Sequence, residues 1–283
     1  MFGYIQEILA DPKGVLLIFL LALPGRLLAI SAHESAHAWV ANRCGDPTAR
    51  LMGRISLNPL KHLDPVGLLM MVLFGFGWAK PVPVNPRNFQ NFKHYRKDDL
   101  KVSVAGVTVN LLLFLTGTLL MYGVVAWALA RLPYYARDWF VTKDMYRTVY
   151  NGVPALVSGG YWYDLTELMR YGTSLSDILI APVFGKVAGY FYQMLAYFVT
   201  TNLVLAVFNL IPLPPLDGYH VLNDLVLKRP IFADLRGQQI GTLLLLAGVL
   251  TGVLDKALGW VYSGVMSQIG ALFTWLFELI KLM

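Results

Sequence analysis

The sequence predicts an all-α polytopic membrane protein with five or six transmembrane helices, one re-entrant hairpin and short extended segments. The 283-residue chain is 57% hydrophobic and only 14% charged, whereas soluble domains are about a quarter charged. Several uncharged apolar runs reach the roughly 18 residues that indicate a bilayer-spanning helix. Basic residues gather in the loops between alternate runs, as is typical of cytoplasmic loops.

The composition excludes several other classes of protein. The single cysteine, Cys44, excludes a disulfide scaffold, and the hydrophobicity excludes a disordered chain. The net charge is +6, but the sequence has no long basic run or basic patch with interleaved aromatics, so we expect no nucleic-acid partner. We interpret residues 1–283 as a single domain, with a core at 14–226, an outside loop at 131–177 and C-terminal helices at 237–283.

The first predicted span, Gly14–Asn42, is unusual because it contains ionisable residues. Pro24 predicts a kink, and His33, Glu34 and His37 follow where lipid-facing residues are expected. Ionisable groups at membrane depth are costly unless they face the protein interior, pair with one another or bind a metal. This span therefore predicts a functional site.

The next apolar segment, Pro65–Ala79, predicts a re-entrant hairpin, because 15 residues are too few for an ordinary crossing. Both of its flanks are basic, so both belong on the cytoplasmic side of the membrane. The upstream flank holds Arg43, Arg50, Arg54 and Lys61, and the downstream flank holds Lys80, Arg87, Lys93, Arg96, Lys97 and Lys101.

Four further spans complete the predicted topology. They are Val102–Ala130, Val187–Ile211, Gly237–Leu254 and Ala257–Phe277. The loop Arg131–Asp177 carries as many acidic as basic residues and several clustered aromatics, which predicts an outside loop lying in the outer interface. The N-terminus is then outside, and the first span ends on the cytoplasmic side at Arg43.

The residues His33-Glu34-Ser35-Ala36-His37 form a HExxH motif. On a helix, positions i and i+4 share a face, so both imidazoles can reach one zinc ion while Glu34 lies beside its open position. With five histidines in the chain, the chance expectation of this pattern is roughly one in a thousand. The alternative is a pair of core histidines bonded to a glutamate, which would bury three ionisable groups without a metal.

A catalytic zinc site needs a third protein ligand. The candidates are His62, His94, His220, Asp64 and Asp217. His94 lies in a basic loop, and His62 and Asp64 precede the re-entrant segment, where capping and turn roles are favoured. Asp217 follows a span in a proline-broken stretch at the depth of His33 and His37, and irregular backbone there is tolerated where it lines a cavity. A plain Asp-Gly turn is the alternative for Asp217.

Five sequence segments carry a resemblance to a known family. They are His33–His37, Gly53–Pro59, Asp64–Gly67, Phe76–Pro86 and Asn209–Gly218. Together they resemble the site-2 protease family of intramembrane zinc metalloproteases, and most closely its short prokaryotic branch without an appended regulatory domain. The resemblance covers about Leu28–Asn110 and Thr201–Val226. Val107 stands where the family often has proline, which predicts a straighter helix there.

The resemblance implies one zinc ion per chain. It makes His33, His37 and Asp217 the zinc ligands and Glu34 the catalytic acid and base. We therefore expect a multi-pass cell-membrane endopeptidase that cleaves transmembrane segments of other proteins, with its active site toward the cytoplasmic side. A zinc transporter and a non-catalytic module that binds membrane proteins are the alternatives.

Two further expectations concern the substrate. Asn110 and Asn209 are polar residues in otherwise apolar spans, and we expect them to orient the substrate backbone or a developing oxyanion; interhelical hydrogen bonding is the alternative. The proline-rich segment Pro81–Phe89 is expected to be extended and to pair with an unwound substrate as an added strand, with a simple surface loop as the alternative.

Overall fold

The computed structural model describes residues 9–74, 77–90, 95–131, 180–227, 232 and 234–281, and within them the chain is helical, with one isolated β-bridge. The longer helices are α2 (Pro12–Arg43), α4 (Pro65–Phe74), α5 (Tyr95–Arg131), α10 (Lys186–Asn209), α11 (Asp217–Leu225), α12 (Leu235–Leu250) and α13 (Val253–Lys281). The short helices are α3 (Thr48–Leu51), η1 (Pro59–Lys61), η2 (Pro86–Asn88) and α9 (Ala181–Phe184). This helical content confirms the predicted all-α class.

Three of the described helices are long and apolar enough to cross a membrane: Pro12–Arg43, Tyr95–Ala128 and Lys186–Asn209. They coincide with three predicted spans, which confirms a membrane-type fold. The helix α12 is apolar but has only 16 residues, and α13 contains the predicted span Ala257–Phe277. The total of five or six spans stays a prediction, and residues 132–177 of the expected outside loop lie outside the described residues.

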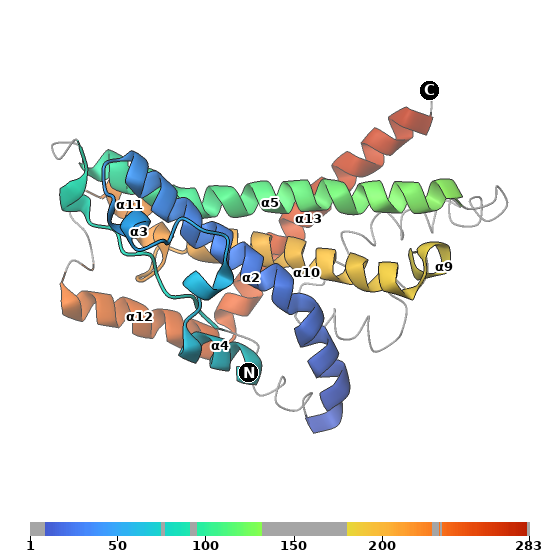
Figure 1. Ribbon diagram of the computed structural model, residues 1–283, viewed down its shortest axis with the longest axis horizontal. Helices are drawn as coiled ribbons and strands as arrows, with labels where there is room; N and C mark the ends of the chain where they lie inside the picture. The colour runs from blue at the N-terminus through green and yellow to red at the C-terminus, as the bar shows by residue number, and fades with distance from the viewer. Residues whose placement is uncertain are drawn as a thin grey trace. The chain divides into compact units, whose positions relative to one another are not determined.

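The helix α2 begins two residues before the predicted span Gly14–Asn42 and is bent (Figure 1), as the proline inside it predicts. The Asp11 side chain caps it by accepting a hydrogen bond from the Gly14 amide at 3.0 Å, and Pro12 occupies its first turn, where a missing amide costs nothing. Pro24 lies inside the helix and removes one backbone hydrogen bond. Figure 1 shows α2 changing direction along its length, as expected for a helix interrupted by proline.

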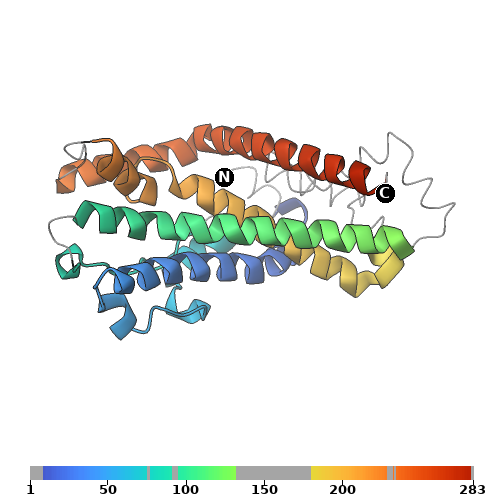
Figure 2. The ribbon, with the colours of Figure 1, turned by 90° about the horizontal axis from the view of Figure 1, so that it is seen from above.

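The chain divides into two compact units, Met1–Leu113 with Thr201–Gly252, and Phe114–Thr200 with Val253–Met283. In the first unit, α2 runs beside the first part of α5 (Figure 2), and the buried residues Ala41, Cys44, Phe89 and Val102 form a core cluster. In the second unit, the ring centroids of Trp127 and Phe184 lie 4.5 Å apart. The motif residues named above all belong to the first unit.

The predicted re-entrant segment folds as a hairpin. The helix α4 has 10 residues, a length of about 15 Å, which is half of a typical hydrocarbon core. Leu63 and Ala79 form an antiparallel bridge, so the chain enters and leaves this segment at the same place. The Asp64 carboxylate accepts a hydrogen bond from the Gly67 amide at 2.8 Å, which is the capping role expected for it. These contacts support a re-entrant hairpin.

Candidate metal centre

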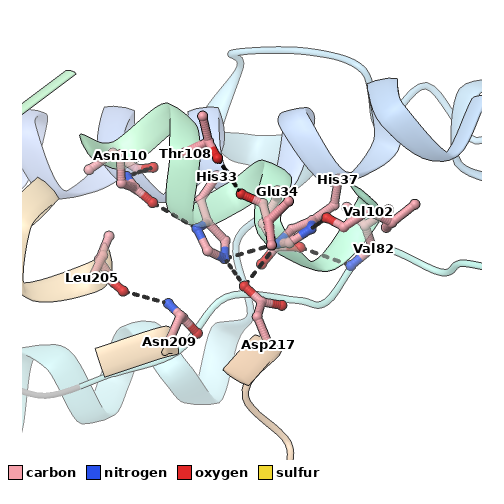
Figure 3. Close-up of polar contacts among 12 residues, drawn as sticks. His33, Glu34, His37, Val82, Val102, Thr108, Asn110, Leu205, Asn209 and Asp217 are labelled. Carbon is pink, nitrogen blue, oxygen red and sulfur yellow. Dashed lines mark hydrogen bonds and ion pairs between the residues drawn. The ribbon is translucent and has the colours of Figure 1, made fainter. Parts of the chain in front are cut away.

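Two imidazoles and one carboxylate converge inside the first unit (Figure 3). His33 and His37 lie one turn apart on α2, both buried, with their Nε2 atoms 3.0 Å apart. Asp217 is the first residue of α11, and its Oδ2 atom lies 3.3 Å from both Nε2 atoms. Within the described residues, these three side chains form the group that could hold a metal ion.

Hydrogen bonds on the far side of each ring define which nitrogen faces the cluster. The Nδ1–H of His37 donates to the backbone carbonyl of Val102, and that of His33 donates to the Asn110 side-chain oxygen, each at 2.7 Å. The amide nitrogen of Asn110 donates to the Ala29 carbonyl and to Asn202, which fixes its oxygen toward His33. Both Nε2 atoms therefore present lone pairs to Asp217.

The residues present fit a zinc ion. Ligand atoms at 2.0–2.2 Å from a tetrahedral zinc lie roughly 3.3–3.5 Å apart, close to the separations observed here. The Asp217 Oδ2 atom is buried and accepts no hydrogen bond from the described residues. Three acceptor atoms facing one another repel, and a bound cation removes that repulsion. Two imidazoles and a carboxylate leave one position open for water or substrate.

Close backbone contacts place Asp217. The proline-broken stretch before it ends at Leu216, which has an extended backbone, and α11 begins at the next residue. A Cβ atom added at Gly218 would lie 2.2 Å from the Leu210 carbonyl oxygen, and one added at Gly241 on α12 would lie 2.5 Å from Pro214. Glycine at both positions therefore lets the stretch pack closely enough to bring Asp217 to the histidines.

Glu34 lies beside the cluster on α2. Its Oε2 atom accepts a hydrogen bond from the backbone amide of Val82 at 2.9 Å (Figure 3). Val82 belongs to the proline-rich segment that the sequence predicts to be extended, and its residues before Pro86 adopt no helix. The structure thus brings the HExxH motif and this segment together.

The other candidate ligands lie apart from this group. His62 is buried, and its Nε2–H donates to the Ser56 carbonyl at 2.8 Å; burial and the nearby Arg54 charge lower its pKa. His220 pairs with Asp99, with the His220 Nδ1 and Asp99 Oδ2 atoms 3.2 Å apart, which raises the pKa of His220. Asp64 caps α4, and His94 lies outside the described residues.

The two asparagines that the sequence singled out, Asn110 and Asn209, differ in their surroundings. Asn110 is fully buried, and its side chain is bonded to His33, Ala29 and Asn202. Asn209 donates from Nδ2 to the Leu205 carbonyl at 2.9 Å. Sequence reasoning missed Asn202, although its signal, a polar residue inside the apolar span 187–211, is the one that singled out Asn209.

Gly106 on α5 is a further residue that sequence reasoning did not assign to the site. A Cβ atom added there would lie 2.4 Å from His37 Nε2 and 2.5 Å from His33 Cε1. Both rings are held by hydrogen bonds, so neither can move aside without losing one. The close approach of α5 to the imidazoles therefore requires glycine.

Replacing Gly106 with alanine is expected to lower zinc affinity by about 10-fold or more, because it displaces the two imidazoles. The control is Gly123→Ala on the same helix, where an added Cβ has no atom within 4 Å. Competition with a chromophoric chelator measures both variants. Equal affinity in Gly106→Ala and Gly123→Ala would show that α5 does not constrain the site.

The fold and this group of side chains define a helical membrane protein with a candidate His–His–Asp metal centre. The family model described as "Peptidase family M50" matches residues 19–251. The chain therefore belongs to peptidase family M50, the site-2 protease family, as its motifs predict.

Two curated relatives are similar to this chain. "Putative zinc metalloprotease YwhC" of Bacillus subtilis (strain 168) is 34% identical over 200 residues, covering 71% of this chain and 66% of the relative. "Putative zinc metalloprotease Rip2" of Mycolicibacterium smegmatis (strain ATCC 700084 / mc(2)155) is 33% identical over 119 residues, covering 39% and 44%. The chain thus matches just under two thirds of the length of the first relative and under half of the length of the second. No solved structure matches the chain significantly.

Proposed function

We propose that this chain is a zinc-dependent intramembrane endopeptidase that hydrolyses peptide bonds within or near transmembrane segments of other membrane proteins. The observation that carries the proposal is the group His33, His37 and Asp217, with Glu34 beside it. Both histidines lie in the last third of the membrane-length helix α2. Membership of peptidase family M50 and the names of both relatives support zinc-dependent peptide hydrolysis.

The site residues divide the chemistry between them. His33 and His37, through Nε2, and Asp217, through Oδ2, would hold one zinc ion per chain. A zinc ion held there supplies Lewis-acid activation of water and of the scissile carbonyl. The Glu34 carboxylate takes the proton of the attacking water and passes it to the leaving amine. In this proposal, the three ligands and Glu34 are the titratable groups of the described residues that take part in hydrolysis.

Asn209 is the asparagine we propose for substrate contact. One of its amide protons is used by the Leu205 carbonyl, which leaves the rest of the side chain for a substrate carbonyl or the developing oxyanion. Asn209→Ala should lower kcat with zinc content unchanged. Lowered thermal stability with unchanged kcat would instead support the interhelical alternative. The side-chain oxygen of Asn110 accepts a hydrogen bond from His33, so Asn110 could contact substrate through this oxygen only after that bond breaks.

The substrate must be locally unwound before cleavage, because a helix holds its peptide groups in i to i−4 hydrogen bonds. The segment Pro81–Phe89 offers a partner, since residues 81–85 are non-helical and pass beside Glu34. We propose that an extended substrate pairs with this segment as an added strand. The polar stretches Gly53–Lys61 and Phe76–Asn85 would admit water from the cytoplasmic side.

A reconstituted cleavage assay tests the function. The protein is inserted into liposomes with a single-span peptide that carries helix-breaking residues, and fragments are followed by mass spectrometry. We expect cleavage inside or beside the span, loss of cleavage on chelation, and recovery on adding about one equivalent of zinc. Zinc flux without fragments would favour a transporter, and peptide binding without fragments across a broad panel would favour a binding module.

The basic loops predict which side of the membrane the site faces. After Cys44 is replaced with serine, a cysteine at Asn88 or at position 228 should react with an impermeant thiol reagent only from the cytoplasmic side. A cysteine at position 144 should react only from outside; positions 144 and 228 lie outside the described residues. Labelling of position 88 from outside would make Pro65–Ala79 a true span and reverse the proposed water path.

A further inference from the structure

The segment that passes Glu34 contains one amide donor between two prolines. Pro81 and Pro83 have no N–H, so Val82 is the residue of this tripeptide that can donate a backbone hydrogen bond. That donor is used: the Val82 amide nitrogen lies 2.9 Å from Glu34 Oε2. A turn or a helix cap joins residues that are close in sequence, whereas this hydrogen bond joins Val82 to a carboxylate 48 positions away, beside the candidate zinc ligands.

Contacts on both sides of Val82 hold its position. Upstream, the Lys80 amide donates to the His62 carbonyl at 2.8 Å, and the Arg54 guanidinium donates to the Lys80 carbonyl. Downstream, the Asn85 amide donates to the carboxylate of Asp46 at 2.7 Å.

The groups that hold the segment are themselves anchored. His62, Arg54 and Asp46 are all buried, and Val84 packs against the core cluster of Ala41, Cys44, Phe89 and Val102. The backbone of residues 80–85 is thus attached to buried groups at three places. Val82 therefore lies on a fixed piece of backbone rather than on a free surface loop.

We infer that the Val82 amide is a positioning group for the general base, holding the Glu34 carboxylate at the open side of the metal centre. The inference rests on the proposed role of Glu34. A carboxylate on a side chain with three rotatable bonds samples many orientations, and one fixed donor on Oε2 leaves Oε1 to face the reacting water. Arg54 and Asp46 act through Val82, since they hold the backbone that carries it.

This role differs from substrate pairing in what each requires of Val82. An amide that is bonded to Glu34 cannot also donate to a substrate carbonyl. If Val82 positions Glu34, loss of its N–H lowers kcat and leaves KM unchanged, because substrate binding does not use this donor. If Val82 pairs with substrate, the same loss raises KM.

Val82→Pro removes the donor, and its ring carbon Cδ takes the place of the N–H, so the Glu34 carboxylate cannot keep this contact. Val82 precedes Pro83 and is therefore already restricted to extended conformations that proline also adopts. Val82→Ala is the matched control, since it shortens the side chain and keeps the N–H. We expect Val82→Pro to lower kcat about 10–100-fold relative to Val82→Ala, with KM and zinc content the same in both variants. A raised KM with unchanged kcat, or equal losses in both variants, would overturn the inference.

Amide hydrogen exchange tests the same contact without any catalysis and in the full chain. Because the flanking prolines have no amide hydrogen, exchange at residues 81–83 reports Val82 alone. Exchange there should be at least about 10-fold faster in Glu34→Ala than in wild type, while the Lys80 amide, bonded to His62, stays unchanged. Equal Val82 exchange in both proteins would overturn the inference even if Glu34 proves essential, whereas cleavage by Glu34→Gln at the wild-type rate would overturn the proposed general-base role of Glu34 instead.

Discussion

Glu34→Gln is expected to lower kcat by about 10²–10⁴-fold while the protein keeps its zinc and still binds a transmembrane substrate. Glutamine has the shape of glutamate and can still accept the Val82 hydrogen bond through its carbonyl oxygen, but it cannot accept a proton from water. Both histidine ligands are untouched by the change. The variant should therefore accumulate uncut substrate.

The matched control is Asp64→Asn, the same carboxylate-to-amide change in the same unit. Asp64 caps α4 through one oxygen, and asparagine is an equally good cap, so the control should cleave at the wild-type rate. Fragment formation by mass spectrometry and zinc content by elemental analysis are measured on the same samples. Equal cleavage by wild type and Glu34→Gln would remove Glu34 from the proton-transfer step.

Asp217→Ala is expected to lower zinc affinity by more than about 100-fold, because it leaves two imidazoles to hold the ion. Its Oδ2 atom lies 3.3 Å from both Nε2 atoms, and no other described carboxylate joins this group. Cleavage should fall with zinc occupancy and recover only partly at high zinc concentration.

Asp224→Ala is the control for Asp217, because Asp224 lies on the same helix and interacts with Asp99 and His220 rather than with His33 and His37. It should bind zinc as tightly as wild type. Full occupancy in Asp217→Ala, together with loss of zinc from a His62 or His220 variant, would assign the third ligand to a different residue.

The parts of the site that follow from local geometry could be predicted from the sequence. The HExxH spacing places His33 and His37 on one face of a helix whatever that helix packs against, and the structure has their Nε2 atoms 3.0 Å apart. The charge flanks and length of Pro65–Ala79 predict a re-entrant segment, and the Leu63–Ala79 bridge supports it. Local geometry was not enough to predict Asp217 as the third ligand. It was preferred to His62 and His220 because of its expected depth in the membrane and because of the family resemblance.

The contacts between helices could not be predicted in this way. Whether Gly106 faces the imidazoles or the lipid depends on the rotation of α5, and an apolar span with no strong amphipathic pattern does not specify it. Asn110 shows the same limit, since the sequence left both substrate contact and interhelical hydrogen bonding open, and its bond to His33 depends on how α5 packs against α2. The Val82 contact with Glu34 joins residues 48 positions apart through a proline-rich segment, and no periodic pattern reports such a pairing.

X-ray absorption spectroscopy of the purified, zinc-loaded protein tests most directly whether His33, His37 and Asp217 hold one zinc ion. We predict about one zinc per chain, with nitrogen and oxygen neighbours at about 2.0–2.2 Å, two of them imidazoles, and one fewer oxygen ligand from the protein in Asp217→Ala. A sulfur neighbour at about 2.3 Å, which would have to come from Cys44, would contradict the assignment. So would a spectrum that is unchanged when both His33 and His37 are replaced with alanine.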